Sequence, residues 1–147
     1  MENRHGLLVD FLVTTASGTA ECAVVPGLMD ELRERRFHPQ TVGLDRGYDT
    51  RDLVAKLRAR DITPHVAQNT AGRRSAIDGR TTRHAGYGIS QRIRMKVEEI
   101  FAWIKTVGGL RKTRYRGLEK VDFAGYLVGA AYNLVRLARI VATPTPA

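Results

Sequence analysis

The sequence predicts an α/β fold for a chain of 147 residues. Two observations support this prediction. Between residues 6 and 67, short apolar runs alternate with longer amphipathic stretches in the order strand, helix, strand, helix, strand, which is typical of a sheet with parallel crossovers. Residues 90–107 and 118–141 then show the apolar periodicity of helices. This length suits one domain, so we expect residues 1–141 to form it and residues 142–147 to be a disordered tail.

The first expected strand covers residues 6–14, which are rich in Leu and Val and end at an Ala-Ser-Gly turn. A helix is then expected to open at Thr19 and Glu21 and to run toward Arg36. Pro26 lies inside this stretch, where it indicates a kink or a delayed start of the helix.

The second strand is expected at residues 40–44, a short apolar run that ends at Asp45. We therefore expect a buried strand with this carboxylate at its carboxyl end. Thr50 is a suitable N-cap for the following helix. The inner face of that helix is expected to carry Leu53, Val54 and Leu57. Residues 62–67 form the third expected strand.

A long polar loop is expected at residues 68–88, where large apolar side chains are scarce and Asn, Thr, Gly, Ser and Arg dominate. Loops of this length inside a compact domain are usually functional or disordered. Residues 90–107 then predict a single helix with one apolar stripe. The last helix, at residues 118–141, is apolar around most of its circumference, so we expect it to pack on several sides.

The charge of the chain favours a polyanionic partner. Twenty-four Lys and Arg residues against 15 Asp and Glu give a formal charge of +9, which suits contacts with nucleic-acid phosphates. A GC-rich genome could raise the Arg content without any binding role. Clustering favours a binding face instead. The first cluster contains Arg73, Arg74, Arg80, Arg83, Arg92, Arg94 and Lys96, and the second contains Lys105, Arg111, Lys112, Arg114 and Arg116.

Membrane and secreted classes are not favoured. The longest apolar stretch is interrupted by charged residues, so it falls short of the roughly 20 apolar residues that a bilayer span needs. The N-terminus has no apolar leader, and the lone Cys22 excludes an internal disulfide and a multi-cysteine metal site. We therefore expect a soluble protein of the cytoplasm.

Two features of the sequence contain candidate functional residues. Asp45 is expected at the carboxyl end of a parallel strand, the edge at which open α/β sheets gather ligand groups. An Asp in such a position can equally be a turn former. Arg94, Glu98 and Lys105 are spaced by four and seven residues, which places a carboxylate between two cations on one helical face. The alternative is a solvated face with ordinary salt bridges.

Three segments carry a resemblance to a known family: LDRGYDTRDLVAKLRARDITPHVAQN, RIRMKVEEIFAWIKTVGGLRKTRYRG and AAYNLVRLARI. They resemble the C-terminal half of DDE-type transposases of bacterial insertion sequences, specifically insertion sequence family five and its relatives. The family's second catalytic Asp lies in an Asp-x-Gly-Tyr-Asp segment, matched here from Asp45 onward. Its catalytic Glu lies in a Tyr-x2-Arg-x3-Glu-x6-Lys pattern, matched by Arg94, Glu98 and Lys105, while Gln91 stands at the position of the Tyr.

The resemblance covers essentially the whole chain and implies a ribonuclease H-like catalytic domain. It implies that Asp45 and Glu98 are catalytic and bind Mg²⁺ or Mn²⁺, the hard cations that carboxylate oxygens suit. Two such ions would serve to break a phosphodiester and to join the freed 3′-hydroxyl to target DNA. The partner is then DNA, both transposon ends and target, in the bacterial nucleoid. The residues expected on DNA are Arg73, Arg74, Arg94, Lys105, Arg111, Lys112 and Arg114.

The resemblance also implies that the first catalytic Asp is missing. It makes residues 6–14 the third strand of the domain and places the first strand and most of the second before Met1. We therefore expect the chain alone to be inactive, and to depend on an upstream transposase chain or on self-association. Frameshifting could join the two parts, or the element could have decayed. Two alternatives stay open: a non-catalytic DNA-binding remnant or transposase inhibitor, and an interaction domain whose basic face is merely solvated.

Overall fold

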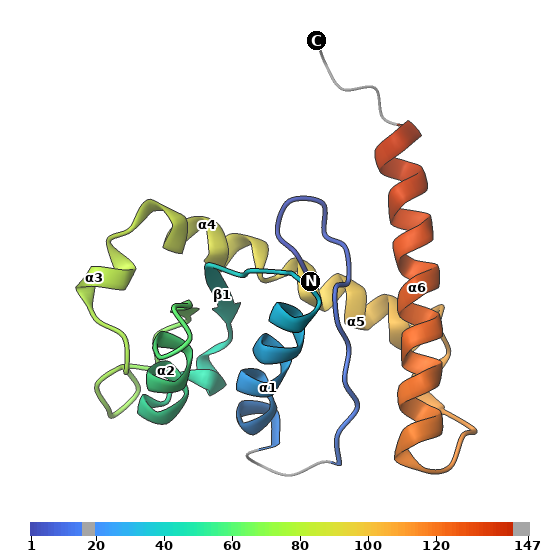
Figure 1. Cartoon of the computed structure of the whole chain (residues 1–147), viewed down its shortest axis with the longest axis horizontal. Helices are drawn as coiled ribbons and strands as arrows, with labels where there is room; N and C mark the ends of the chain where they lie inside the picture. Colours follow the sequence, from blue (N-terminus) through green and yellow to red (C-terminus); the bar gives the residue numbers. More distant parts are fainter. Residues whose placement is uncertain (16–19, 143–147) are drawn as a thin grey trace. The chain divides into compact units, whose positions relative to one another are not determined.

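The computed structural model describes residues 1–15 and 20–142. It divides into two compact units, which we call the sheet unit (Ala16–Met95) and the helical unit (Met1–Thr15 with Lys96–Ala147). Along the chain the elements are α1 (Ala20–Glu34), β1 (Thr41–Leu44), η1 (Arg46–Tyr48), α2 (Arg51–Arg58), β2 (Thr63–Val66), α3 (Gly79–Thr82), α4 (Ala85–Ile93), α5 (Lys96–Thr106), η2 (Leu110–Lys112) and α6 (Leu118–Ala142) (Figure 1).

The sheet unit contains two parallel strands joined by a helix, which confirms the mixed α/β class. β1 pairs with β2 from Thr41 opposite Thr63 to Leu44 opposite Val66. These strands are the second and third expected ones, and α2 is the crossover between them. A crossover helix forms here because a parallel pair cannot be joined by a tight turn.

The start and the inner face of α2 agree with the prediction. The Thr50 side chain caps the helix by accepting a hydrogen bond from the Leu53 amide at 3.3 Å. Leu53, Val54 and Leu57 are all buried, with at most 3% of their surface exposed. Val54 also belongs to a small core with Val66 and Ile77, so α2 is fixed to the sheet by burial of its apolar stripe.

Helix α1 confirms the first expected helix. Pro26 lies inside α1 without ending it. The Asp30 carboxylate on α1 binds the Arg60 guanidinium through two bonds of 2.8 and 2.7 Å, just beyond the end of α2. The expected turn at residues 16–18 and the expected helix start at Thr19 lie outside the described residues.

The polar stretch at residues 68–88 is not one loop, so that prediction is wrong in part. α3 lies within it, and α4 begins at Ala85. Both helices start at side-chain caps: Asp78 accepts from the Arg80 amide, and His84 accepts from the Gly86 amide. Such caps can start a short helix where no apolar stripe predicts one.

The helix expected at residues 90–107 is two helices. α4 ends at Ile93, a turn covers residues 94–95, and α5 begins at Lys96. Arg92 and Lys96 stand four residues apart, a spacing at which like charges destabilise a helix. The sequence therefore disfavours a continuous helix at this point.

In the helical unit, residues 6–14 are extended but pair with no strand of the described chain, so the prediction of a regular strand there is wrong. The segment lies beside α6 instead (Figure 1). The Asn133 side chain accepts from the Leu8 amide and donates to the Leu8 carbonyl, both at 2.8 Å. The Asp122 carboxylate accepts from the Val13 amide at 2.8 Å. These side chains satisfy backbone groups that a neighbouring strand would otherwise bind.

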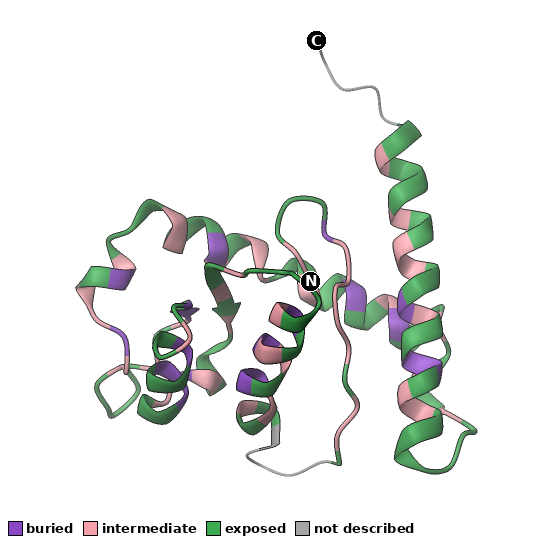
Figure 2. Cartoon of the chain, viewed as in Figure 1, coloured by how far each residue is buried: buried purple, intermediate pink, exposed green. Residues whose placement is uncertain are grey.

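Helix α6 has the expected extent, but its packing differs from the expectation. Its buried residues are Ala124, Gly125 and Gly129, where the missing side chains leave room for the extended segment. Most of its apolar residues are exposed, among them Phe123, Leu134 and Val141 (Figure 2). The expectation of packing on several sides is therefore wrong. No helix in residues 1–15 or 20–142 is long and apolar enough to span a membrane.

The expected disordered tail at residues 142–147 is not described, apart from Ala142 at the end of α6.

Candidate active site

Asp45 follows directly after β1, at the carboxyl end of the two parallel strands. Its backbone is extended, with φ −73° and ψ 169°, and it occupies the N-cap position of the short helix η1 without a side-chain capping bond. The side chain is 62% exposed, so its oxygens are accessible from solvent. The structure thus places an exposed carboxylate at the edge where open α/β sheets bind ligands.

Asp45 forms an ion pair with Arg94, whose side chain is 27% exposed. Arg94 is itself positioned by a second bond, since its Nε donates to Oε1 of Gln91 at 3.0 Å. Gln91 in turn donates through Nε2 to the carbonyl of His65 on β2, at 2.7 Å. A continuous series of bonds therefore runs from the middle of β2 to the Asp45 carboxylate.

The end of α4 is held close to the strands. Ser90 on α4 and Nδ1 of His65 lie 2.7 Å apart in a buried hydrogen bond. A Cβ built on Gly43 in β1 would lie 3.6 Å from the Ser90 carbonyl oxygen and 3.7 Å from the Arg94 Cβ. This close approach of α4 to β1 holds the Arg94 side chain within bonding distance of Asp45.

Asp49, four residues after Asp45, has a structural role that the sequence did not reveal. It is 1% exposed, and its carboxylate accepts from the amides of Asn69 at 2.7 Å and Ala76 at 2.8 Å. Burial alone would raise the pKa of Asp49, but these amides, the Ser75 hydroxyl and the charge of Arg73 together hold that pKa below its usual value. Asp49 therefore fastens the 68–78 segment to the end of the sheet.

Tyr48 connects α1 to the same strand end. Its hydroxyl donates to the Glu21 carboxylate at 3.3 Å. Burial, followed by the charge of Glu21, raises the pKa of Tyr48 to about 12, so the hydroxyl keeps its proton at neutral pH. Cys22 of α1 lies beside the same short helix, with its Sγ 3.7 Å from the Gly47 carbonyl oxygen.

Glu98 lies in the first turn of α5, in the helical unit, and is exposed. Lys105 follows seven residues later on the same helix, so the two side chains share a face as expected. Arg94 does not belong to that face, because the turn at residues 94–95 separates it from α5. The predicted row of Arg94, Glu98 and Lys105 on one helix is therefore wrong, while the roles expected of them stay predictions.

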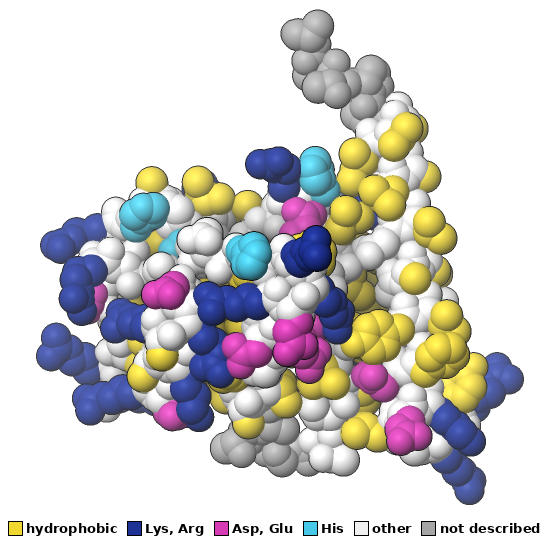
Figure 3. Space-filling model, viewed as in Figure 1, with side chains coloured by type: hydrophobic (Ala, Val, Ile, Leu, Met, Phe, Trp, Pro, Cys, Tyr) yellow, Lys and Arg dark blue, Asp and Glu magenta, His cyan; other side chains and the backbone are white. Residues whose placement is uncertain are grey.

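The basic residues expected on DNA are distributed over both units. In the sheet unit, Arg73 donates to the Asp49 carbonyl at 2.6 Å, so part of its guanidinium is engaged, while Arg74 is exposed. In the helical unit the exposed cations are Lys105, Arg111, Lys112 and Arg114. Figure 3 shows that Lys and Arg side chains also gather over α2 and α3.

The expected metal ligands are not gathered in one unit, because Asp45 belongs to the sheet unit and Glu98 to the helical unit. Within residues 1–15 and 20–142, no group of three or more His, Cys, Asp or Glu side chains could hold a metal ion. The role of Gln91 as a support for Arg94 could not be inferred from its position in the motif. Asp49 could have been suspected, since the Asp-x-Gly-Tyr-Asp segment contains two acidic residues.

Comparison with protein-family models matches residues 1–134 to the family described as "Transposase DDE domain". A search of curated proteins found no significant match, and neither did a search of solved structures. The matched range includes every described residue of the sheet unit and α5. It therefore contains both Asp45 and Glu98.

Proposed function

Because the chain belongs to the transposase DDE domain family, we propose that it takes part in metal-dependent cutting and joining of DNA during transposition. Asp45 and Glu98 are, in this proposal, two of the three metal-binding carboxylates. The observation that carries it is the position of Asp45, exposed at the carboxyl end of β1 and held by Arg94. We further assign the chain to the ribonuclease H-like transposases of insertion sequence family five and its relatives, as the C-terminal part of such a protein.

The oxygen ligands of Asp45 and Glu98 are of the chemical type that the expected metal ions bind. Carboxylate oxygens are the ligands that Mg²⁺ and Mn²⁺ prefer, and both carboxylates are accessible from solvent. When bound, two such ions activate the nucleophile and stabilise the leaving oxygen of the phosphodiester. The two matched motifs contain the second Asp and the Glu of the site. We place the first Asp on a further segment or chain, so the chain alone should not cut DNA.

In this proposal Arg94 affects metal binding by the Asp45 carboxylate. Its guanidinium contacts Oδ1 of Asp45, so a divalent cation at that oxygen would compete with it. Metal binding there would displace Arg94, which could then contact a DNA phosphate. Gln91 keeps the guanidinium close by, since it binds the Arg94 Nε. A DNA-directed role of this kind places the protein with the bacterial chromosome.

The test compares metal binding and DNA binding in the full chain. Asp45→Asn and Glu98→Gln should each weaken Mn²⁺ binding, measured by electron paramagnetic resonance, while leaving DNA affinity within about twofold. Glu99→Gln is the matched control, because Glu99 is an exposed neighbour of Glu98 on α5. Equal Mn²⁺ binding by all three variants would contradict the assignment of the ligands. Cleavage of DNA by the monomeric chain with Mg²⁺ would contradict the proposal that it is incomplete.

The second candidate is a non-catalytic DNA-binding remnant or inhibitor of an intact transposase. The exposed cations of the helical unit favour it, namely Lys105, Arg111, Lys112 and Arg114. Each phosphate that they contact adds about 0.9 to the slope of log affinity against log salt concentration. A remnant would keep this salt dependence and would tolerate Asp45→Asn and Glu98→Gln in every assay, including complementation of an intact transposase.

A further inference from the structure

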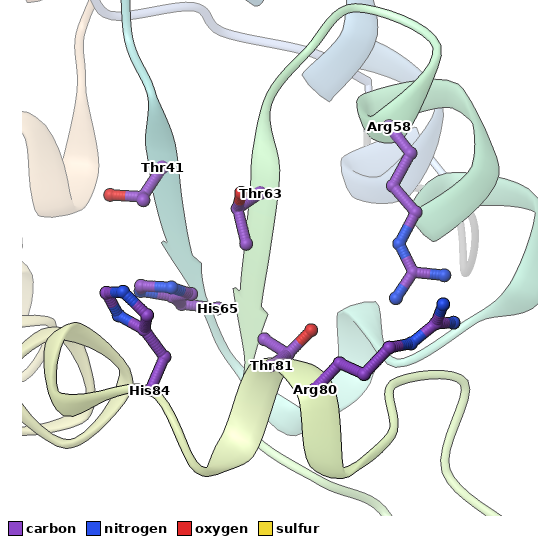
Figure 4. Close-up of a pocket in the computed structure, with 7 residues that line it drawn as sticks. All are labelled: Thr41, Arg58, Thr63, His65, Arg80, Thr81 and His84. Carbon is purple, nitrogen blue, oxygen red and sulfur yellow. The ribbon is translucent and has the colours of Figure 1, made fainter.

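A second candidate site lies at the opposite end of the strands from Asp45. It is an open pocket of about 430 Å³, lined by Thr41, Arg58, Thr63, His65, Arg80, Thr81 and His84 (Figure 4). Thr41 and Thr63 are the first residues of β1 and β2. Asp45 follows Thr41 by four residue steps, which corresponds to about 13 Å of extended chain. The pocket is thus distinct from the candidate active site, and all of its residues belong to the sheet unit.

The lining combines hydrogen-bond donors and positive charge without a carboxylate. It contains two arginines, two histidines and three threonine hydroxyls. Figure 4 shows the Arg58 and Arg80 side chains extending from α2 and α3 toward the same place, with the two imidazoles together beside the strands. Such a set of donors suits an oxyanion that accepts several hydrogen bonds at once.

The two arginines differ in how they are held. Arg80 is fixed by Asp78, whose oxygens accept from its Nε at 3.0 Å and from one of its terminal nitrogens at 2.8 Å. The Arg58 side chain forms no hydrogen bond or ion pair with the residues that the structure describes. Hydrogen bonds from Arg80, followed by the charges of Arg80 and Arg58, lower the pKa of Asp78 to about 2. The single negative charge of Asp78 therefore balances one of the two guanidinium charges, and a net positive charge remains in the pocket.

The two imidazoles also lie close together. A Cβ built on Gly86 would lie 3.1 Å from Nδ1 of His84 and 3.6 Å from Cε1 of His65. Nδ1 of His84 accepts a hydrogen bond from the Gly86 amide at 3.2 Å, so the neutral ring carries its proton on Nε2 and can donate. Burial, and then the proximity of His84, lower the pKa of His65. The Nε2 proton of His84 is therefore available to an anion in the pocket.

We propose that this pocket binds a phosphate group. A phosphate oxyanion is tetrahedral and accepts bonds from several directions, which matches donors that converge from α2, α3, the start of α4 and both strands. The phosphate can come from free inorganic phosphate or from a nucleic-acid strand, either at a terminal monoester or along the backbone. The inference does not rest on the proposed metal chemistry: of the lining residues only His65 also contacts the candidate active site, where its carbonyl accepts from Gln91 and its Nδ1 bonds Ser90.

Calorimetric titration of the full chain with inorganic phosphate, at low ionic strength and without metal, tests the proposal. The wild-type chain should bind one phosphate per chain. Arg58→Gln should weaken binding about tenfold, the typical value of a charge-assisted hydrogen bond. Lys56→Gln is the matched control, because it removes the same charge from the same helix outside the pocket, and it should change the affinity by less than about twofold.

Thr81→Val keeps the charge and the side-chain volume, so it should weaken binding without reducing the general attraction for anions. The Cε1 proton resonances of His65 and His84 should shift as phosphate is added to the wild-type chain. Thermal unfolding followed by circular dichroism checks that each variant is folded. The proposal is overturned if phosphate does not bind, or if Lys56→Gln weakens binding as much as Arg58→Gln.

Competition identifies the source of the phosphate. Two otherwise identical oligonucleotides, one with a 5′-phosphate and one with a 5′-hydroxyl, are added to the phosphate-bound chain. Displacement by the phosphorylated strand alone identifies a terminal monoester as the ligand, and displacement by both strands identifies the backbone. Displacement by neither identifies free phosphate. Each of these three results supports the pocket as a phosphate site if Arg58→Gln also weakens binding of the ligand that the result identifies.

Discussion

Replacing Asp49 by Asn should destabilise the chain strongly at neutral pH. The carboxylate is 1% exposed and accepts from the amides of Asn69 and Ala76 with its two oxygens. Asn keeps one oxygen, so one of the two amides would face an NH₂ group and lose its acceptor. Hydrogen bonds to charged groups contribute about 1.5–3 kcal/mol each, so we expect the free energy of unfolding to fall by about 2–3 kcal/mol.

The same prediction has a pH dependence. Because the pKa of Asp49 is lowered in the folded chain, its ionised form stabilises the fold above the unfolded-state pKa of about 3.9. This contribution is lost as the pH falls through the lower folded-state pKa. The difference in unfolding free energy between wild type and Asp49→Asn should therefore be full at pH 7 and should shrink below about pH 4.

Urea unfolding followed by circular dichroism measures this difference. Asp52→Asn is the control, since that carboxylate is 74% exposed and pairs with Lys56 on the surface of α2. It should cost less than about 1 kcal/mol. Faster hydrogen exchange at the Asn69 and Ala76 amides should accompany Asp49→Asn. Our account of Asp49 is refuted if both variants are equally stable at pH 7, or if the effect of Asp49→Asn does not change with pH.

Further predictions concern α6 and α1. Gly125→Ala should lower the unfolding free energy by about 1–3 kcal/mol, because its new methyl group would collide with the Phe11 ring. Gly27→Ala, in α1 with nothing within 4 Å of the new Cβ, should instead raise it by up to about 1 kcal/mol. Thermal unfolding of both variants tests the pair, and an equal effect of the two would refute the contact. Asn133→Ala should cost about 1–3 kcal/mol by releasing the Leu8 backbone, and an unchanged exchange rate of the Leu8 amide would contradict this role.

The sequence predicted the elements whose structure depends on local signals. β1, α2 and β2 follow from two apolar runs around an amphipathic stretch, and Thr50 caps α2 as its position indicates. Residues 6–14 also have the composition of a strand, but they do not pair. Strand formation requires a partner, and the composition of a segment does not reveal that α6 will bind its backbone through Asn133 and Asp122.

The sequence predicted where the candidate residues lie in the secondary structure, but it did not predict their contacts. Strand order and helix spacing place Asp45 at the carboxyl end of β1 and Glu98 with Lys105 on one face of α5. The division between α4 and α5 was missed, because apolar periodicity continues across residues 94–95 and conceals the turn. The bond from Gln91 to the His65 carbonyl joins residues 26 apart in sequence, so only the tertiary structure reveals it.

Our central proposal is that Asp45 and Glu98 are both ligands of the catalytic metal ions. Hydroxyl radicals produced by bound Fe²⁺ cleave the backbone near the metal, so the sites of cleavage report which residues surround it. In the full chain with Fe²⁺, ascorbate and peroxide, we predict cleavage near both residues, and loss of both cleavages in Asp45→Asn and in Glu98→Gln. Cleavage near only one of them, or cleavage that both variants retain, would contradict the claim.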